Sequence, residues 1–145
     1  MRSTRGRLPV LAAVALLLLA GCATQPAQDP GPSEAALQAA IEEIDGVTAA
    51  SVHFSEEFPI GSGYVGDVYV DGEADPLCVL DTVWAILWQG RSTSVNVIVH
   101  QGEEETDWLD GDDFPVGEIA QFEARYGPRP AGPTVVTPEP PPYCD

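Results

Sequence analysis

The chain has two histidines, His53 and His100, and each lies in a segment where apolar and polar residues alternate. Such alternation is typical of a strand with one buried and one exposed face, and both histidines fall out of phase with the apolar positions. We therefore expect them on the exposed face of a sheet. The polar residues expected on the same face complete a candidate binding surface: Ser51, Asp67, Tyr69 and Asn96.

Catalysis on this face would need a nucleophile, a base and an oxyanion donor in register. No serine of the chain lies in a nucleophile-elbow motif. We therefore interpret His53, Tyr69 and His100 as candidate binding residues, predict no catalytic residue, and expect that the protein is not an enzyme.

An acidic segment, residues 103–113, gathers carboxylates, which are the ligands that calcium prefers. The candidate metal ligands in it are Asp107, Asp110 and Asp112. Their spacing is not that of an EF-hand loop, so a solvated acidic loop is the competing interpretation. Trp108 lies in the middle of the segment, where it either anchors the loop to the core or forms an exposed contact for a partner.

A glycine pattern spans residues 61–66 and matches G-x-G-x-x-G letter for letter. That pattern binds a pyrophosphate when it follows a strand and opens a helix. Here it precedes a segment of strand-like alternation, so we interpret it as a hairpin connection and predict no cofactor.

Two cysteines, Cys78 and Cys144, are candidates for a disulfide. Such a bond would persist in an exported protein and would hold the C-terminal segment across the helix that contains Cys78. The alternatives are a buried Cys78 with a free Cys144, or a bond between two molecules. Neither cysteine has the C-x-x-C spacing of a redox or zinc site.

The elements that must position these residues follow from periodicity and capping signals. Ser33 and Gly46 bound a first predicted helix, and alternation over 50–54 and 64–70 predicts a hairpin. A second helix starts at Pro76 behind Asp75, with an apolar surface that extends to Trp88. A strand follows over 95–100, and a last short helix over 116–126. The order α-β-β-α-β-α predicts an α+β fold with a small mixed sheet of about three strands and helices packed on one face.

The N-terminal residues have the pattern of a signal peptide for export. Three arginines without an acid precede an apolar run from Leu8 to Ala20, which is shorter than the roughly 20 residues that span a bilayer. Leu19, Ala20, Gly21 and Cys22 then stand in an order that resembles the lipobox of bacterial lipoproteins. The resemblance covers residues 1–22 and implies cleavage after Gly21 and lipidation of Cys22. The alternative is an ordinary secretory signal with an incidental cysteine. The whole chain is also similar to small, uncharacterised lipoproteins of actinobacteria.

The net charge of the chain after Gly21 limits the classes of partner that it can bind. All 23 acidic residues follow Gly21, against three arginines and no lysine, so the formal charge there is −20 with neutral histidines. A charge of this sign repels nucleic acid and anionic lipid, and no nucleic-acid partner is expected.

We expect a signal peptide over 1–21, a lipidated Cys22 with a flexible tether over 22–32, a domain over 33–127 and a Pro-rich tail over 128–145. The predicted location is the extracytoplasmic face of the cell membrane, to which the lipid anchors the chain. The predicted function is non-catalytic binding of a protein or another envelope component, and the alternative is calcium or ion binding by loop 103–113.

Overall fold

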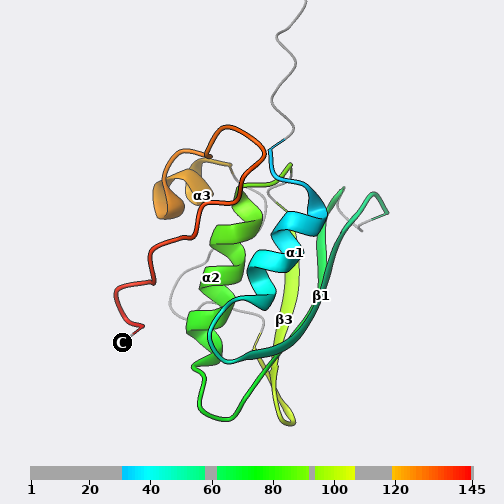
Figure 1. Ribbon diagram of the computed structural model, residues 1–145, viewed down its shortest axis with the longest axis vertical. Coiled ribbons are helices and arrows are strands. Elements are labelled where there is room, and N and C mark those ends of the chain that lie inside the picture. Colours follow the sequence, from blue (N-terminus) through cyan, green and yellow to red (C-terminus); the bar gives the residue numbers. More distant parts are fainter. Residues whose placement is uncertain (1–30, 58–61, 92–93, 107–118, 145) are drawn as a thin grey trace, which may run out of the picture.

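The computed structural model describes residues 31–57, 62–91, 94–106 and 119–144 of the chain. Its elements are the helices α1 (Glu34–Glu42), α2 (Pro76–Trp88) and α3 (Ile119–Tyr126) and the strands β1 (Val47–Ser55), β2 (Gly63–Val70), β3 (Val95–Gln101) and β4 (Glu104–Thr106). Figure 1 shows their arrangement. The α+β class is as predicted, with one additional strand, β4. None of the described helices is long and apolar enough to cross a membrane.

The strands form one mixed sheet in the order β1-β2-β3-β4. β1 and β2 pair antiparallel, which confirms the predicted hairpin, and β2 and β3 pair parallel. Parallel neighbours need a crossover connection, and α2 is that connection. The predicted β-α-β crossover is therefore confirmed. Gly63 begins β2, so the glycine pattern leads into a strand rather than a helix.

Helices α1 and α2 both lie on one face of the sheet, as expected (Figure 1). Every second residue of the strands points to these helices, and burial of these apolar side chains supplies the main driving force for folding. The side chains that form the centre of this core are Leu37, Ile41, Val68, Leu80, Val83, Trp84, Leu87, Val97, Val99 and Phe122. The broad apolar surface of α2 is buried because it packs between the sheet, α1 and α3.

The helix ends follow the capping signals of the sequence. The Ser33 hydroxyl accepts a hydrogen bond from the backbone N–H of Ala36, and the Asp75 carboxylate accepts one from Leu77. These side chains satisfy backbone donors that the first turn of a helix leaves free. The last helix ends at Tyr126, and Gly127 follows it with a positive φ of 76°. The predicted start of this helix near residue 116 lies outside the described residues.

Strand β4 was not predicted, because its residues were assigned to the acidic loop. It pairs antiparallel with β3, with Gln101 opposite Glu104. Gly102 has a φ of 66° at the first position of this two-residue turn, a position that favours glycine in hairpins. The turn therefore brings a segment of low strand propensity, Glu-Glu-Thr, into register with the end of β3.

The Pro-rich tail packs along α2 without forming a helix or strand (Figure 1). The predicted disulfide is confirmed: Cys78 in α2 is bonded to Cys144, with a Cα–Cα distance of 5.6 Å. The Gln89 side chain also pairs with both backbone groups of Val136, at 2.7 Å each. The structure therefore excludes the alternatives of a free Cys144 and a bond between two molecules.

One edge of the sheet is covered by a side chain. Gln38 of α1 accepts a hydrogen bond from the backbone N–H of Val52 at 2.9 Å and donates one to the carbonyl of Ala50 at 2.7 Å. Both groups belong to the edge strand β1, whose unpaired backbone would otherwise be open to another chain. Gln38 therefore closes the middle of this edge to strand addition.

Candidate functional site

The sheet has a second face, which α1 and α2 leave uncovered. Val68 and Val99 point to the helices, so the residues that alternate with them along the strands point to the opposite side. We call this side the open face. Its residues are Ala49, Ser51 and His53 of β1, Val65, Asp67 and Tyr69 of β2, Asn96, Ile98 and His100 of β3, and Glu105 of β4. The polar residues predicted to share an exposed face therefore do so.

The most distinctive feature of the open face is a stacked pair of rings. Tyr69 and His100 are direct partners in the parallel β2–β3 register, and their ring centroids lie 4.8 Å apart with planes only 17° from parallel. Tyr69 keeps 46% of its surface exposed, whereas the His100 side chain is mostly covered. The pair therefore presents a flat aromatic surface to the solvent.

Two carboxylates flank this ring pair. His100 Nε2 lies 2.8 Å from Asp67 Oδ1, and His100 Nδ1 lies 3.7 Å from Glu105 Oε1. About half of the Asp67 side chain and two thirds of the Glu105 side chain are exposed, at 48% and 66%. We call the four residues Asp67, Tyr69, His100 and Glu105 the Tyr69–His100 cluster. It combines an aromatic plane with exposed negative charge.

His53 lies on the open face but away from this cluster. It pairs with Val65, which pairs in turn with Asn96. Asn96 and His100 are four residues apart on β3, a separation of about 13 Å along a strand. The two histidines therefore share a face without sharing a site, and they cannot act on one substrate atom.

The acidic loop contributes only its first residues to the described structure. Trp108 and the metal candidates Asp107, Asp110 and Asp112 lie outside the described residues. Within the described part of the chain, no three His, Cys, Asp or Glu side chains are grouped so that they could hold a metal ion.

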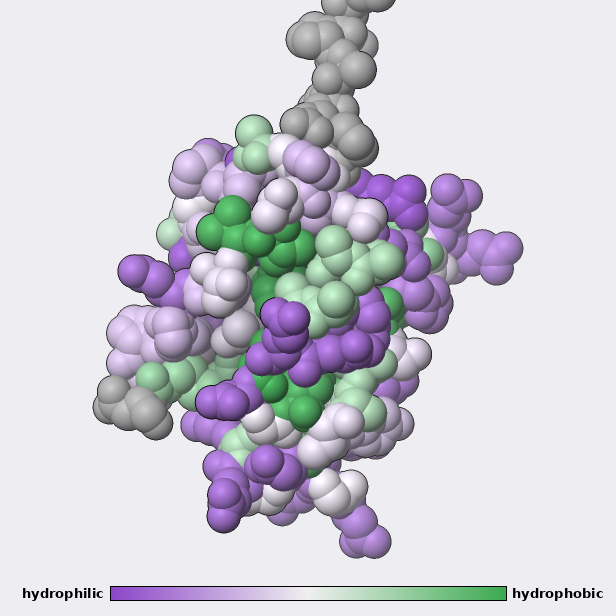
Figure 2. Space-filling view, viewed as in Figure 1, coloured by the Kyte–Doolittle hydropathy of each residue, from purple (hydrophilic) through white to green (hydrophobic). Residues whose placement is uncertain are grey.

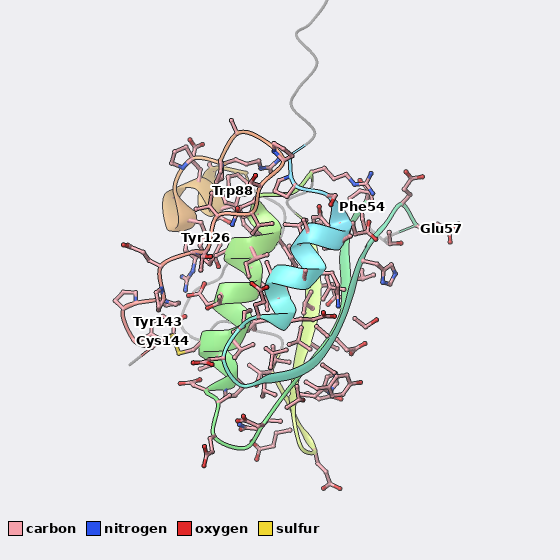
Figure 3. The ribbon with its side chains drawn as sticks, viewed as in Figure 1. Phe54, Glu57, Trp88, Tyr126, Tyr143 and Cys144 are labelled. Carbon is pink, nitrogen blue, oxygen red and sulfur yellow. A yellow bond between two sulfur atoms is a disulfide. The ribbon has the colours of Figure 1, made fainter. Side chains whose placement is uncertain are left out.

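A buried charge cluster, which was not predicted from the sequence, lies on the helical side of the sheet. Asp81, in the middle of α2, is 2% exposed. Arg125 donates to its two carboxylate oxygens at 2.9 and 2.7 Å. The hydroxyls of Tyr126 and Tyr143 donate to the same carboxylate at 2.5 Å each. Figure 3 shows both tyrosines on the same side of α2. Asp81 therefore joins α2 to α3 and to the tail.

The environment of Asp81 keeps it ionised. Burial alone would raise the pKa of this carboxyl, but the hydrogen bonds from Arg125, Tyr126 and Tyr143 outweigh it and hold the pKa below the usual value of an aspartate. Burial and the adjacent carboxylate raise the pKa of Tyr143 to about 12. The only sequence signal for this cluster was a single acid in an otherwise uncharged helix, and its partners lie 44 to 62 residues away.

A cavity of about 640 Å³ lies beside this cluster, between α2, α3 and the tail. Trp88, at the end of α2, lines it and donates from its indole N–H to the carbonyl of Gly127 at 3.0 Å. The carboxylate of Asp81 already accepts four hydrogen bonds, which fills its capacity. Asp81 is therefore a structural link and not a free base.

On this side of the molecule, hydrophilic side chains separate the hydrophobic ones (Figure 2).

The comparisons with known proteins give no family for this chain. No protein-family model matches it, and no match was found among the curated proteins or the solved structures.

Proposed function

We propose that this protein is a lipid-anchored, non-catalytic domain of the cell envelope that binds another envelope protein through its open face. Cys22 carries the anchor, and residues 22–30 connect it to the domain, which begins two residues earlier than predicted because Pro32 is buried and Gly31 lies against the backbone of Gln89. A segment of this length reaches at most about 30 Å when fully extended. It therefore keeps the domain close to the membrane surface.

The observation that carries this proposal is the Tyr69–His100 cluster. A solvated sheet face is common in antiparallel sheets and is not by itself a binding site. Here the face displays a half-exposed tyrosine stacked on a histidine, with a carboxylate on either side. Exposed aromatic rings of this kind are enriched in protein interfaces, where they lose little conformational entropy on binding.

Two other observations support a binding role for the face. Gln38 covers the backbone at the centre of β1, which disfavours binding by strand addition at that edge. The carboxylate of the buried Asp81 already accepts hydrogen bonds from Arg125 and two tyrosines. The two histidines of the open face lie at different register positions along the strands, so they do not form one site. These arrangements favour contact by side chains of the open face over chemistry at a buried group.

Site-specific photo-crosslinking of the full chain in the cells that make it tests this proposal. A photoreactive residue replaces Ser51, which is exposed on the open face, or Ala39, which is exposed on α1. We expect one discrete crosslinked product from position 51 and none from position 39. The absence of a product from position 51, or the same products from both positions, would contradict the proposal.

A further inference from the structure

The fixed positive charges of the chain after Gly21 all lie away from the open face. Three arginines carry them, and each already has a partner. Arg91 lies over the ring of Phe54 at 3.7 Å and 3.7 Å from Glu34. Arg125 pairs with Asp81, and Arg129 lies over the ring of Trp88 at 4.3 Å. An anionic partner would therefore meet no fixed cation on the open face.

The contacts of these arginines within the chain also show which chemical group of a partner would bind the Tyr69–His100 cluster. Arg91 lies over an aromatic ring with a carboxylate nearby, and Arg129 lies over an indole. A guanidinium stacks on aromatic planes and binds carboxylates in the same way when it comes from another molecule. The Tyr69–His100 cluster displays both elements to the solvent, a ring and two carboxylates.

Long-range electrostatics favour the same class of partner. The chain after Gly21 has a formal charge of −20, and a field of that sign attracts cationic surfaces and repels anionic ones before contact. Asp67 and Glu105 are exposed enough to meet an incoming cation without first being uncovered. Both the local chemistry and the overall charge therefore point to a positively charged partner.

From these observations we infer that the partner of the open face is a basic segment of another envelope protein. One of its arginine or lysine side chains lies on the exposed ring of Tyr69 and pairs with Asp67 or Glu105. This inference rests on the proposed function, because it names the chemistry of the partner bound by the same face.

Variants of the full chain in which the two carboxylates are replaced by amides test the inference. The measured quantity is the yield of crosslinked product from position 51, which we call capture. The double variant Asp67→Asn, Glu105→Gln removes two charges, while the amide introduced at position 67 keeps an acceptor oxygen for His100. The control variant Glu73→Gln, Glu123→Gln removes two charges from exposed positions outside the open face. We expect capture to fall roughly tenfold in the first pair and to stay near the parent level in the second.

A second variant, Tyr69→Leu, removes the ring and leaves every charge in place. We expect it to reduce capture several-fold, and sequencing of the crosslinked peptide should show a segment of net positive charge. An acidic or uncharged segment, or an equal loss in both charge pairs, would overturn this inference and leave the proposed function standing. The absence of capture from position 51 in the parent protein would instead contradict the proposed function.

Discussion

The hydroxyl of Tyr143 donates to the carboxylate of Asp81 at 2.5 Å, across 62 residues of sequence. Cys144, the next residue, is bonded to Cys78 one helical turn before Asp81. The C-terminal tail is therefore attached to α2 by a covalent bond and a hydrogen bond at adjacent positions (Figure 3). This attachment makes the tail part of the folded unit, although its proline content excludes regular secondary structure over most of its length.

The disulfide should contribute strongly to stability. It joins residues separated by 66 positions, and closing a loop of that length contributes roughly 4 kcal/mol in the chain-entropy model. The double variant Cys78→Ser, Cys144→Ser should therefore lose about this much free energy of unfolding in urea titration. An unchanged unfolding midpoint, with the parent protein shown to be oxidised, would contradict the account of the tail.

Asp81 should make the fold sensitive to acid. Because its pKa in the folded state lies below the ordinary value of an aspartate, the stabilisation that it supplies is complete at pH values above that ordinary pKa. That stabilisation is lost as the pH falls through the folded-state pKa. The variant Asp81→Asn should be less stable by about 3–5 kcal/mol at neutral pH, since it leaves Arg125 without its charge partner.

The matched control for this prediction is Glu123→Gln, which removes an exposed acid from α3. Unfolding free energies measured between pH 6 and pH 2 should converge for the parent and Asp81→Asn proteins as the pH falls. Parallel curves for these two proteins would show that Asp81 does not supply the acid-sensitive stabilisation.

Gly66 should not tolerate a side chain, because β1 passes close to it in the sheet. A Cβ added there would lie 2.0 Å from the carbonyl oxygen of Ser51, whereas one added at Gly72 would meet no atom within 4 Å. We expect Gly66→Ala to destabilise the protein by about 1–3 kcal/mol or more and Gly72→Ala to have little effect. Thermal unfolding of the two variants provides the comparison, and equal melting temperatures would refute the β1–β2 register.

Cys22 should carry the lipid if the anchor is as proposed. Cells grown with an alkyne-labelled fatty acid should incorporate the label into the parent protein but not into Cys22→Ser. Intact mass of the parent protein should correspond to a chain that begins at Cys22 with acyl groups attached. A labelled Cys22→Ser protein, or an unlipidated parent chain, would contradict the proposed anchor.

Local sequence signals predicted most of the elements. Asp75 before Pro76 marked the start of α2, and the alternation around Val97 marked β3, because capping and strand periodicity depend on neighbouring residues. The pairing of Cys78 with Cys144 was one of three possibilities left by the sequence, since lipidation of Cys22 leaves two cysteines, and the structure decides between them. The polar residues that β1, β2 and β3 contribute to the open face were also predicted, since their phase along each strand fixes the side on which they lie. Glu105 was not predicted to lie there, because β4 was assigned to the acidic loop.

The features that were not predicted depend on contacts between distant segments. β4 has a low strand propensity and forms because the turn at Gly102 aligns it with β3. The stacking of Tyr69 on His100 requires the parallel register of β2 and β3, which periodicity does not give. The partners of Asp81 come from α3 and the tail, so no local pattern around α2 identifies them.

Solvent accessibility of the open face in living cells tests the central claim most directly. Cysteine replaces Ser51 on the open face or Ala39 on α1, and a membrane-impermeant maleimide labels each variant in intact cells and after purification. We expect that Ser51→Cys is labelled several-fold more slowly in cells than after purification, while Ala39→Cys shows no such difference. Equal ratios for the two positions would contradict the claim that the open face is the surface that binds a partner.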